Sequence, residues 1–228
     1  MQPEENQYKK VISYITSHMD DYTPREIQYM IDNYDMGSRT RFAPDVLRQI
    51  YDTLEITPEK DNMYRGFVSL LKENFDINTD IIEVGGGVIP VVAKHIREAQ
   101  TSGSVTVYDP RVSKRIESTD GFQLRREMFQ ENTNVGNASL IIGFMPCQAT
   151  ELIIRKAVEN NADFLIALCE GGHYEFDDYF DEVEWRESIK YLARRELADK
   201  KMGTLEETDL KSFGDPYPVI YSKRRNFK

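Results

Sequence analysis

Three short segments of this chain carry residues that could bind a nucleoside and act on it. Three consecutive glycines, 85–87, follow the apolar run 81–84, and Asp109 follows a second apolar run. The third segment, around Cys147, follows the run 139–144. Glycines let a ligand approach the backbone closely, a carboxylate can accept hydrogen bonds from both hydroxyls of a ribose, and a thiol can act as a nucleophile. The order of these segments predicts a nucleotide-like ligand across the carboxyl ends of a parallel sheet.

The glycine segment differs from the loops that bind dinucleotides and nucleoside triphosphates. The dinucleotide fingerprint is G-x-G-x-x-G, and here Pro90 stands where the third glycine belongs. The sequence also has no phosphate-binding loop that ends in Gly-Lys-Ser/Thr, which argues against an NTPase. Pro90 instead suits the first turn of a helix, where its missing N–H costs nothing. The alternative interpretation is an ordinary glycine-rich turn between a strand and a helix.

Asp109 has two interpretations of its own. It lies 24 residues after Gly85, the distance at which an acidic side chain can bind a ribose after the second strand of such a unit. Asp109 and Pro110 together are also a common way to open a turn. Because a strand, a glycine turn and a helix precede it, ribose binding is the favoured interpretation.

This ordered set of segments resembles the class I S-adenosylmethionine-dependent methyltransferases, over about residues 75–225. The resemblance implies that the glycine turn contacts the methionine half of S-adenosyl-L-methionine and that Asp109 holds the ribose hydroxyls. We therefore expect this cofactor, and no metal. The residues expected at the cofactor are Glu83, Gly85, Gly86, Gly87, Asp109, Pro110, Gly143, Phe144 and Pro146.

The resemblance also places the transferable methyl group beside the segment around Cys147. The Asn/Asp-Pro-Pro-aromatic signature of amine-methylating members is missing there, which disfavours methylation of adenine N6. Pro146 and Cys147 are similar to the Pro-Cys loop of DNA cytosine-5 methyltransferases, and Glu170 follows the next strand as in that family. However, Met145 interrupts the motif, and no segment is long enough for a target-recognition domain. A cysteine that only lines the cofactor loop, or packs in the core, is the alternative.

Three residues are expected to contribute to the chemistry. Cys147 and Glu170 would border the methyl group and its acceptor. His173 lies in a glycine-containing loop, and its pKa near neutrality would suit a general base. An ordinary surface histidine is the other interpretation of His173.

Composition limits the partners. The chain has 228 residues and a formal net charge of −10, which disfavours broad nucleic-acid binding. It starts with a polar segment rather than a signal peptide, and no apolar run approaches the length of a membrane span. Its two cysteines form neither a zinc pattern nor a disulfide framework. We therefore expect a cytoplasmic protein with a small-molecule substrate and no membrane partner; nucleic acid is disfavoured as a partner but stays open, since a local basic patch could exist.

The pattern from residue 76 to 228 predicts an α/β core. Strands alternate with helices, which indicates a Rossmann-like, mostly parallel sheet with helices on both faces and an antiparallel last strand after an acidic loop. A weaker strand or turn is expected at 122–129. The expected strands are 81–84, 104–108, 139–144, 163–169 and 218–223, and the expected helices are 90–100, 111–117, 149–160 and 181–200.

Residues 1–75 are expected to form an N-terminal α-helical cap. Apolar residues recur at helical spacing from Val11 to Met19, and Thr23 to Glu26 form a capping box with proline at the first helical position. Further helices would begin at Pro44 and near Thr57. Several tyrosines in this region could line a substrate pocket, although half-buried helix packing explains them equally simply.

Together these features predict a methyltransferase that uses S-adenosylmethionine on a small-molecule acceptor. Two alternatives remain open. A nicotianamine synthase-like protein would transfer the aminobutyl group of the same cofactor, and a non-catalytic nucleoside-binding subunit would use the fold as a sensor or partner.

Overall fold

The computed structural model describes seven stretches of the chain, and the chain divides into two compact units, Met1–Met63 and Tyr64–Lys228. In the first unit, the described residues 12–17 are helical and lead to the 3-10 turn η1 (Met19–Asp21). The helices expected from Thr23 and from Pro44 lie outside the described residues. The described residues are 10, 12–21, 59–87, 89–114, 116–169, 182–210 and 217–224.

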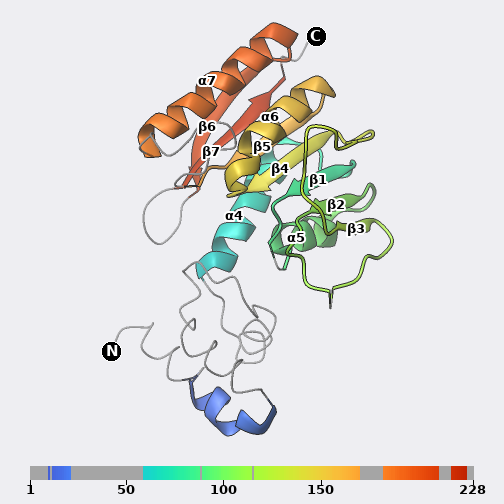
Figure 1. Ribbon diagram of the computed structural model, residues 1–228, viewed down its shortest axis with the longest axis vertical. Coiled ribbons are helices and arrows are strands. Elements are labelled where there is room, and N and C mark those ends of the chain that lie inside the picture. The colour runs from blue at the N-terminus through green and yellow to red at the C-terminus, as the bar shows by residue number, and fades with distance from the viewer. Residues whose placement is uncertain are drawn as a thin grey trace. The chain divides into compact units, whose positions relative to one another are not determined.

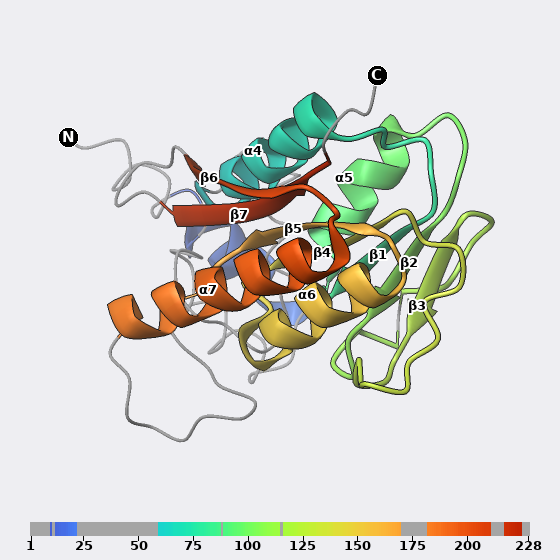
Figure 2. The ribbon, with the colours of Figure 1, turned by 90° about the horizontal axis from the view of Figure 1, so that it is seen from above.

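The second unit is built on one seven-stranded sheet with the order β3-β2-β1-β4-β5-β7-β6 (Figures 1 and 2). The first five strands of the chain pair in parallel, and β7 is antiparallel to both β5 and β6. This confirms the expected Rossmann-like sheet with an antiparallel last strand. The strands are β1 (Ile81–Val84), β2 (Val105–Tyr108), β3 (Phe122–Arg125), β4 (Leu140–Phe144), β5 (Asp163–Ala167), β6 (Thr204–Leu210) and β7 (Tyr217–Lys223).

Helices cover both faces of this sheet. Figure 2 shows α4 and α5 on one face and α6 and α7 on the other. On the first face, Phe67 of α4 meets Phe144 at the end of β4 edge to face, with the ring centroids 5.4 Å apart. Among the described residues, every helix is too short or too polar to cross a membrane. The helices are α4 (Glu59–Asn74), α5 (Val91–Ala99), α6 (Thr150–Glu159) and α7 (Glu182–Lys200), with a 3-10 turn, η2 (Cys147–Ala149), before α6.

The central strands are buried on both faces, as a parallel sheet between two helical layers requires. All residues of β1 and β4 are buried, and so are the last four of β5. Their β-branched and aliphatic side chains suit strands without a solvent face. On the α6–α7 side, Trp185 is 1% exposed and packs in one cluster with Ile153 and Phe164. Apart from the buried Glu83, polar side chains therefore leave these central strands only at the strand ends.

Two expectations about local structure were wrong. The expected helix over 111–117 is a series of turns in the described residues. The Arg126 guanidinium donates to the carbonyl oxygens of Ser113 (3.0 Å) and Ile116, and Ser113 O also accepts the Ile116 N–H (3.2 Å) in a turn three residues long rather than an α-helical bond. Asp109 likewise accepts the backbone N–H two residues further on, at 2.7 Å. Such side-chain bonds compete with helix formation.

The second error concerns β6, which was expected to be an acidic loop. It is a strand at the edge of the sheet and pairs with β7 along its whole length. Lys190 of α7 forms an ion pair with Glu207 of β6 (2.9 Å), and Arg194 of the same helix also pairs with Glu207. Charged residues are typical of edge strands, and their presence here hid the strand pattern.

The small residue Gly143 in β4 allows close packing beneath the loop that follows. A Cβ at this position would lie 2.7 Å from Ile153 Cδ1 and 2.7 Å from Pro146 Cγ. Real Cβ atoms do not approach so closely, so the glycine is required by its neighbours. By contrast, among the described residues a Cβ on Gly66 of α4 would meet only Leu210 Cδ2, at an ordinary 3.8 Å.

Replacing these two glycines by alanine should therefore have opposite effects on stability. We expect Gly143→Ala to lower the free energy of unfolding by about 1–3 kcal/mol, because the added methyl overpacks the contact with α6. Gly66→Ala should raise it by about 0.5–1 kcal/mol, because alanine restricts the unfolded chain and favours the helix. Chemical denaturation of both variants measures the difference. A Gly143→Ala variant as stable as the parent would contradict the packing described here.

Candidate functional site

The candidate site lies where the loops after β1, β2 and β4 meet. Carboxyl ends of parallel strands share one edge of the sheet, and the strand order reverses between β1 and β4, which is where such sheets bind ligands. Each loop begins with a residue that still bonds to the next strand. Gly85 N–H donates to Tyr108 O (2.9 Å), Asp109 N–H to Arg125 O (3.1 Å), and Met145 N–H to the carbonyl of the last residue of β5, Ala167 (2.9 Å). The sheet ladder therefore fixes where all three loops start.

The three glycines of the first loop have separate reasons to be glycine. Gly85 and Gly87 have φ of 78° and 75°, a region that favours glycine. A Cβ on Gly85 would lie 3.3 Å from Pro146 Cα, so the loops after β1 and β4 touch. A Cβ on Gly86 would come within 2.7 Å of Val107 Cγ1, which is a packing constraint. A Cβ on Gly87 would meet no described atom within 4 Å, so a ligand can approach the backbone here.

Glu83 lies beneath this turn and caps the helix that follows. Its side chain is buried, and its Oε2 accepts a hydrogen bond from the Ala93 N–H in the first turn of α5 (3.1 Å). Pro90 occupies the N-cap position of α5 and has no side-chain acceptor of its own. Glu83 therefore supplies from the neighbouring strand the acceptor that an N-cap residue normally provides.

Burial changes the charge of this carboxyl group. It raises the pKa of Glu83 from 4.5 to about 8; the hydrogen bond from Ala93 opposes this rise, and the nearby charge of Asp109 adds to it. At neutral pH, Glu83 is thus mostly protonated and can still accept the bond from Ala93. The position of Glu83 is explained by α5, and its expected contact with a cofactor stays a prediction.

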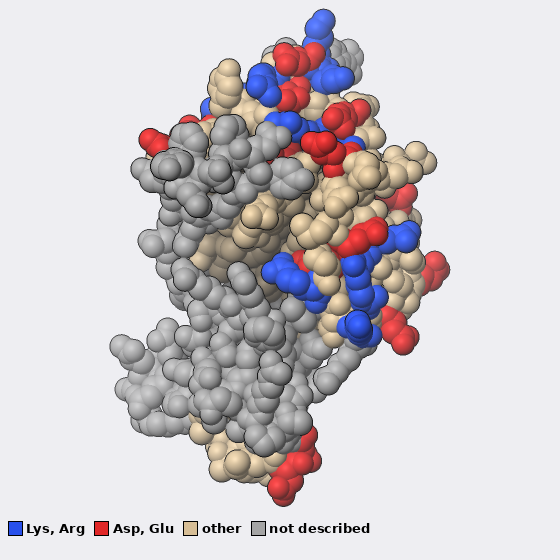
Figure 3. Space-filling view, viewed as in Figure 1, with Lys and Arg blue, Asp and Glu red and all other residues tan. Residues whose placement is uncertain are grey.

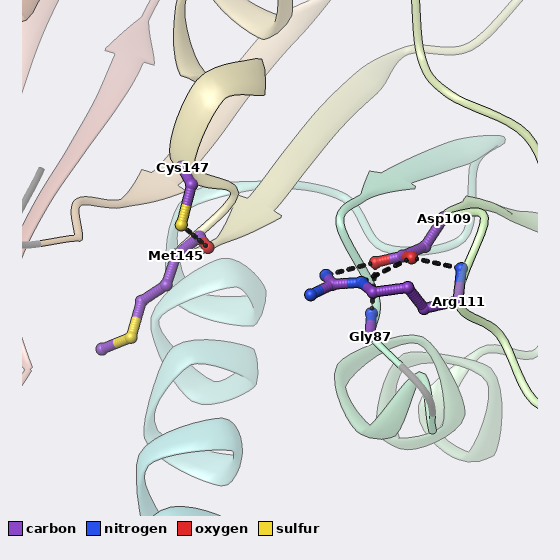
Figure 4. Close-up of polar contacts among 5 residues, drawn as sticks. All are labelled: Gly87, Asp109, Arg111, Met145 and Cys147. Atoms are coloured by element: carbon purple, nitrogen blue, oxygen red, sulfur yellow. Dashed lines mark hydrogen bonds and ion pairs between the residues drawn. The ribbon is translucent and has the colours of Figure 1, made fainter. Parts of the chain in front are cut away.

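Asp109 is the charged centre of the site (Figure 4). Its side chain is only 2% exposed, and four hydrogen-bond donors surround it. Oδ2 accepts the Gly87 N–H (2.9 Å) and Arg111 Nη2 (2.8 Å), while Oδ1 accepts the Arg111 N–H (2.7 Å) and Arg111 Nε (3.0 Å). Burial by itself would raise the pKa of Asp109, but the bonds from Arg111 and Gly87 outweigh it and hold the pKa below its usual value. Asp109 is therefore ionised.

Arg111 was missed by the sequence reasoning. It binds Asp109 through both a backbone and a side-chain group, and this depends on the tight turn that Asp109 and Pro110 open. An aspartate that begins a turn and is followed two residues later by an arginine is the signal that could have revealed it.

The loop after β4 is held in an uncommon backbone conformation. Met145 and Cys147 have φ of 51° and 50°, although neither is glycine. Each such residue costs about 1 kcal/mol, and strain of this kind concentrates at functional sites. The Cys147 thiol is exposed and lies 3.5 Å from the Met145 carbonyl oxygen (Figure 4). Thr150 Oγ1, which is buried, holds the loop from below by donating to Cys147 O (2.8 Å).

Some of the predicted site residues have positions that packing explains, and others lie outside the described residues. Phe144 is buried and contacts the rings of Tyr64 and Phe67 of α4, so its position is explained by packing. The same holds for Gly143. Pro110 is exposed beside Asp109. Glu170 and His173 lie outside the described residues, and their roles stay predictions.

A polar cavity of about 430 Å³ lies elsewhere, at the amino ends of β4 and β5. Asp163 and Arg224 line it and form an ion pair at 2.9 Å. Because parallel sheets bind ligands at the opposite, carboxyl edge, this cavity is not the candidate site.

No protein-family model matches the sequence, and no curated protein matches it. The structure is similar to magnesium protoporphyrin IX methyltransferase from Synechocystis PCC 6803 with bound SAH, with a TM-score of 0.50 and 10% identity over 90% of this chain and 97% of that one. The chain has the fold of the class I S-adenosylmethionine-dependent methyltransferases. The same Synechocystis enzyme with bound SAM gives a TM-score of 0.49 at 10% identity (99% and 100% covered), and a SAM-dependent methyltransferase from Aquifex aeolicus gives 0.46 at 14% identity (79% and 98% covered).

The raised pKa of the buried Glu83 indicates how the stability of this fold depends on pH. Because its pKa is about 8 in the folded chain and 4.5 when exposed, the folded state holds an extra proton between these values. The free energy of unfolding should therefore fall as pH rises from about 5 to 8, with a slope from this group of up to about 1.4 kcal/mol per pH unit. Glu83→Gln keeps an acceptor for Ala93 but cannot ionise, so this part of the slope should disappear.

Denaturation curves at several pH values test this expectation. Glu131→Gln, which removes an exposed carboxylate, is the matched control and should keep the slope of the parent protein. Parallel profiles for Glu83→Gln and the parent would show that Glu83 is already ionised in the folded state, contrary to the environment described.

Proposed function

We propose that this chain is a methyltransferase that uses S-adenosyl-L-methionine to methylate a small molecule in the cytoplasm. The observation that carries the proposal is the ionised, buried carboxylate of Asp109, bonded to the Gly87 N–H of the glycine turn. In this proposal Asp109 accepts the ribose hydroxyls, and the open backbone of Gly87 lies beside it, next to the reversal of strand order between β1 and β4.

The residues present fit this cofactor. Asp109 offers negatively charged oxygens, which suit a vicinal diol, and Gly87 leaves open space at the backbone, which suits the methionine half. Gly85 brings the loop of Pro146 against the glycine turn, so a group bound at the turn borders the third loop as well. When bound, S-adenosylmethionine supplies a methyl group activated by a sulfonium.

The residues of the chain would then align the cofactor with its acceptor and exclude water from the site. Methyl transfer depends on alignment and desolvation more than on acid–base help. In this proposal Asp109 fixes the sugar, the glycine turn fixes the opposite end, and the strained loop with Cys147 borders the acceptor. Glu170 and His173 would orient the acceptor, and His173 would accept its proton where one is released.

The proposed acceptor is a small molecule rather than a nucleic acid. The net charge of −10 supports this choice, and Figure 3 shows acidic and basic side chains intermingled over the described part of one face. In this proposal residues 76–228 form the catalytic core and residues 1–75 a helical cap.

Calorimetric titration tests cofactor binding. The parent protein should bind S-adenosylmethionine and S-adenosylhomocysteine and prefer both to NAD. Asp109→Ala should weaken both by at least about tenfold, because the ribose hydroxyls lose a charged acceptor. Asp120→Ala, which removes an exposed carboxylate elsewhere, should bind like the parent. A preference for NAD, or unchanged affinity in Asp109→Ala, would overturn the assignment.

Product analysis distinguishes the possible reactions. Incubation with S-adenosylmethionine and a panel of small acceptors should yield S-adenosylhomocysteine. Methylthioadenosine would instead indicate aminobutyl transfer, and tight binding without turnover across the panel would indicate a binding subunit.

A further inference from the structure

The Arg111 side chain occupies acceptor positions on Asp109 that a ribose would need. A carboxylate offers about four acceptor positions. On Asp109 these are filled by two backbone N–H groups, from Gly87 and Arg111, and by Nε and Nη2 of the Arg111 guanidinium. A ribose hydroxyl can bond to Asp109 only if one of these donors leaves.

The four donors differ in how easily they can leave. The Gly87 N–H belongs to a turn whose first residue is held in the sheet ladder, and the Arg111 N–H belongs to the turn that Asp109 begins. The guanidinium is carried by a flexible side chain that is 57% exposed. It can therefore move into solvent without unfolding any element, and it is the group that a ligand would displace.

We propose that Arg111 occupies the sugar site and sets its affinity, and that a nucleoside with a vicinal diol binds by exchanging its two hydroxyls for the guanidinium on Asp109. This inference rests on the proposed function, because it takes Asp109 as the ribose acceptor. Nucleosides that lack the diol cannot replace both guanidinium bonds and would leave Arg111 in place. The pair thus lowers the affinity for every ligand that must displace Arg111, whereas a nucleoside without the diol displaces nothing and is not weakened by the pair.

Because the ligand must displace Arg111, the affinity for the ligand depends on the strength of the ion pair between Arg111 and Asp109. Arg111 forms a two-pronged, charge-assisted contact, which a lysine cannot reproduce. Salt screens the pair because one partner is exposed. The affinity for neutral adenosine should therefore rise with ionic strength in the parent protein and stay constant when Arg111 is uncharged.

Titration of adenosine and S-adenosylhomocysteine into Arg111→Gln tests the inference. We expect this variant to bind both about three- to thirtyfold more tightly than the parent, and Arg111→Lys to lie between them. The affinity for 2′,3′-dideoxyadenosine should change by less than about twofold, because no diol enters. Lys114→Gln removes an exposed positive charge from the same loop and should bind like the parent. A thermal melt checks that each variant is folded. If Arg111→Gln is unfolded, the same titrations of Arg111→Lys test the inference instead.

A second readout follows the side chain directly. The ¹⁵N–¹H signal of Arg111 Nε, assigned by its loss in Arg111→Gln, should exchange slowly with water in the free protein and rapidly once adenosine is bound.

The outcomes separate this inference from the proposed function. Weaker binding of adenosine to Arg111→Gln, with Asp109→Ala still defective, would mean that Arg111 contacts the ligand, which overturns the exchange and leaves the function standing. Equal tightening for 2′,3′-dideoxyadenosine would also overturn it. Failure of the parent and of every Arg111 variant to bind adenosine or S-adenosylhomocysteine would overturn both.

Discussion

The bond between the Asp109 carboxylate and the Gly87 N–H joins two loops that leave neighbouring strands. It places one negative charge at the reversal of strand order and holds the glycine turn against it. Glu83 lies close by and stays protonated, partly because Asp109 already carries the charge. Two buried carboxyl groups thus divide their roles. The neutral one caps α5, and the ionised one binds the glycine turn and Arg111.

The rest of the edge is arranged by packing. Since the central strands are buried on both faces, their polar groups emerge only where the strands end, and this concentrates chemistry at one edge. Small residues then bring the loops together. Gly86 and Gly143 leave room for their neighbours, and Gly85 lets the backbone of Pro146 touch the first loop. The site is therefore a product of the core, because the same close contacts that stabilise the sheet also align its loops.

Much of the fold could be predicted from the sequence, since β-branched runs, glycines and prolines act locally. The strand 81–84, the strand expected at 163–169 (observed at 163–167) and the order of the site segments follow from such signals. What could not be predicted depends on distant partners. Arg126 binds the turns at 113–116 where a helix was expected, and β7 turns an acidic segment into β6. At the site, Asp109 and the glycines could be predicted, whereas the contact of Arg111 required the actual turn geometry.

The position of β6 bears on how copies of this chain meet one another. As the last strand in the described sheet, it presents one side of its backbone to any extended segment that could pair with it. Its sequence, Thr-Leu-Glu-Glu-Thr-Asp-Leu, places three carboxylates along that border. Glu207 is paired with Lys190 and Arg194, so Glu206 and Asp209 carry the negative charge that would repel a second β6 brought alongside. This border thus discourages fibrous stacking, and the protein can accumulate without growing its sheet from chain to chain.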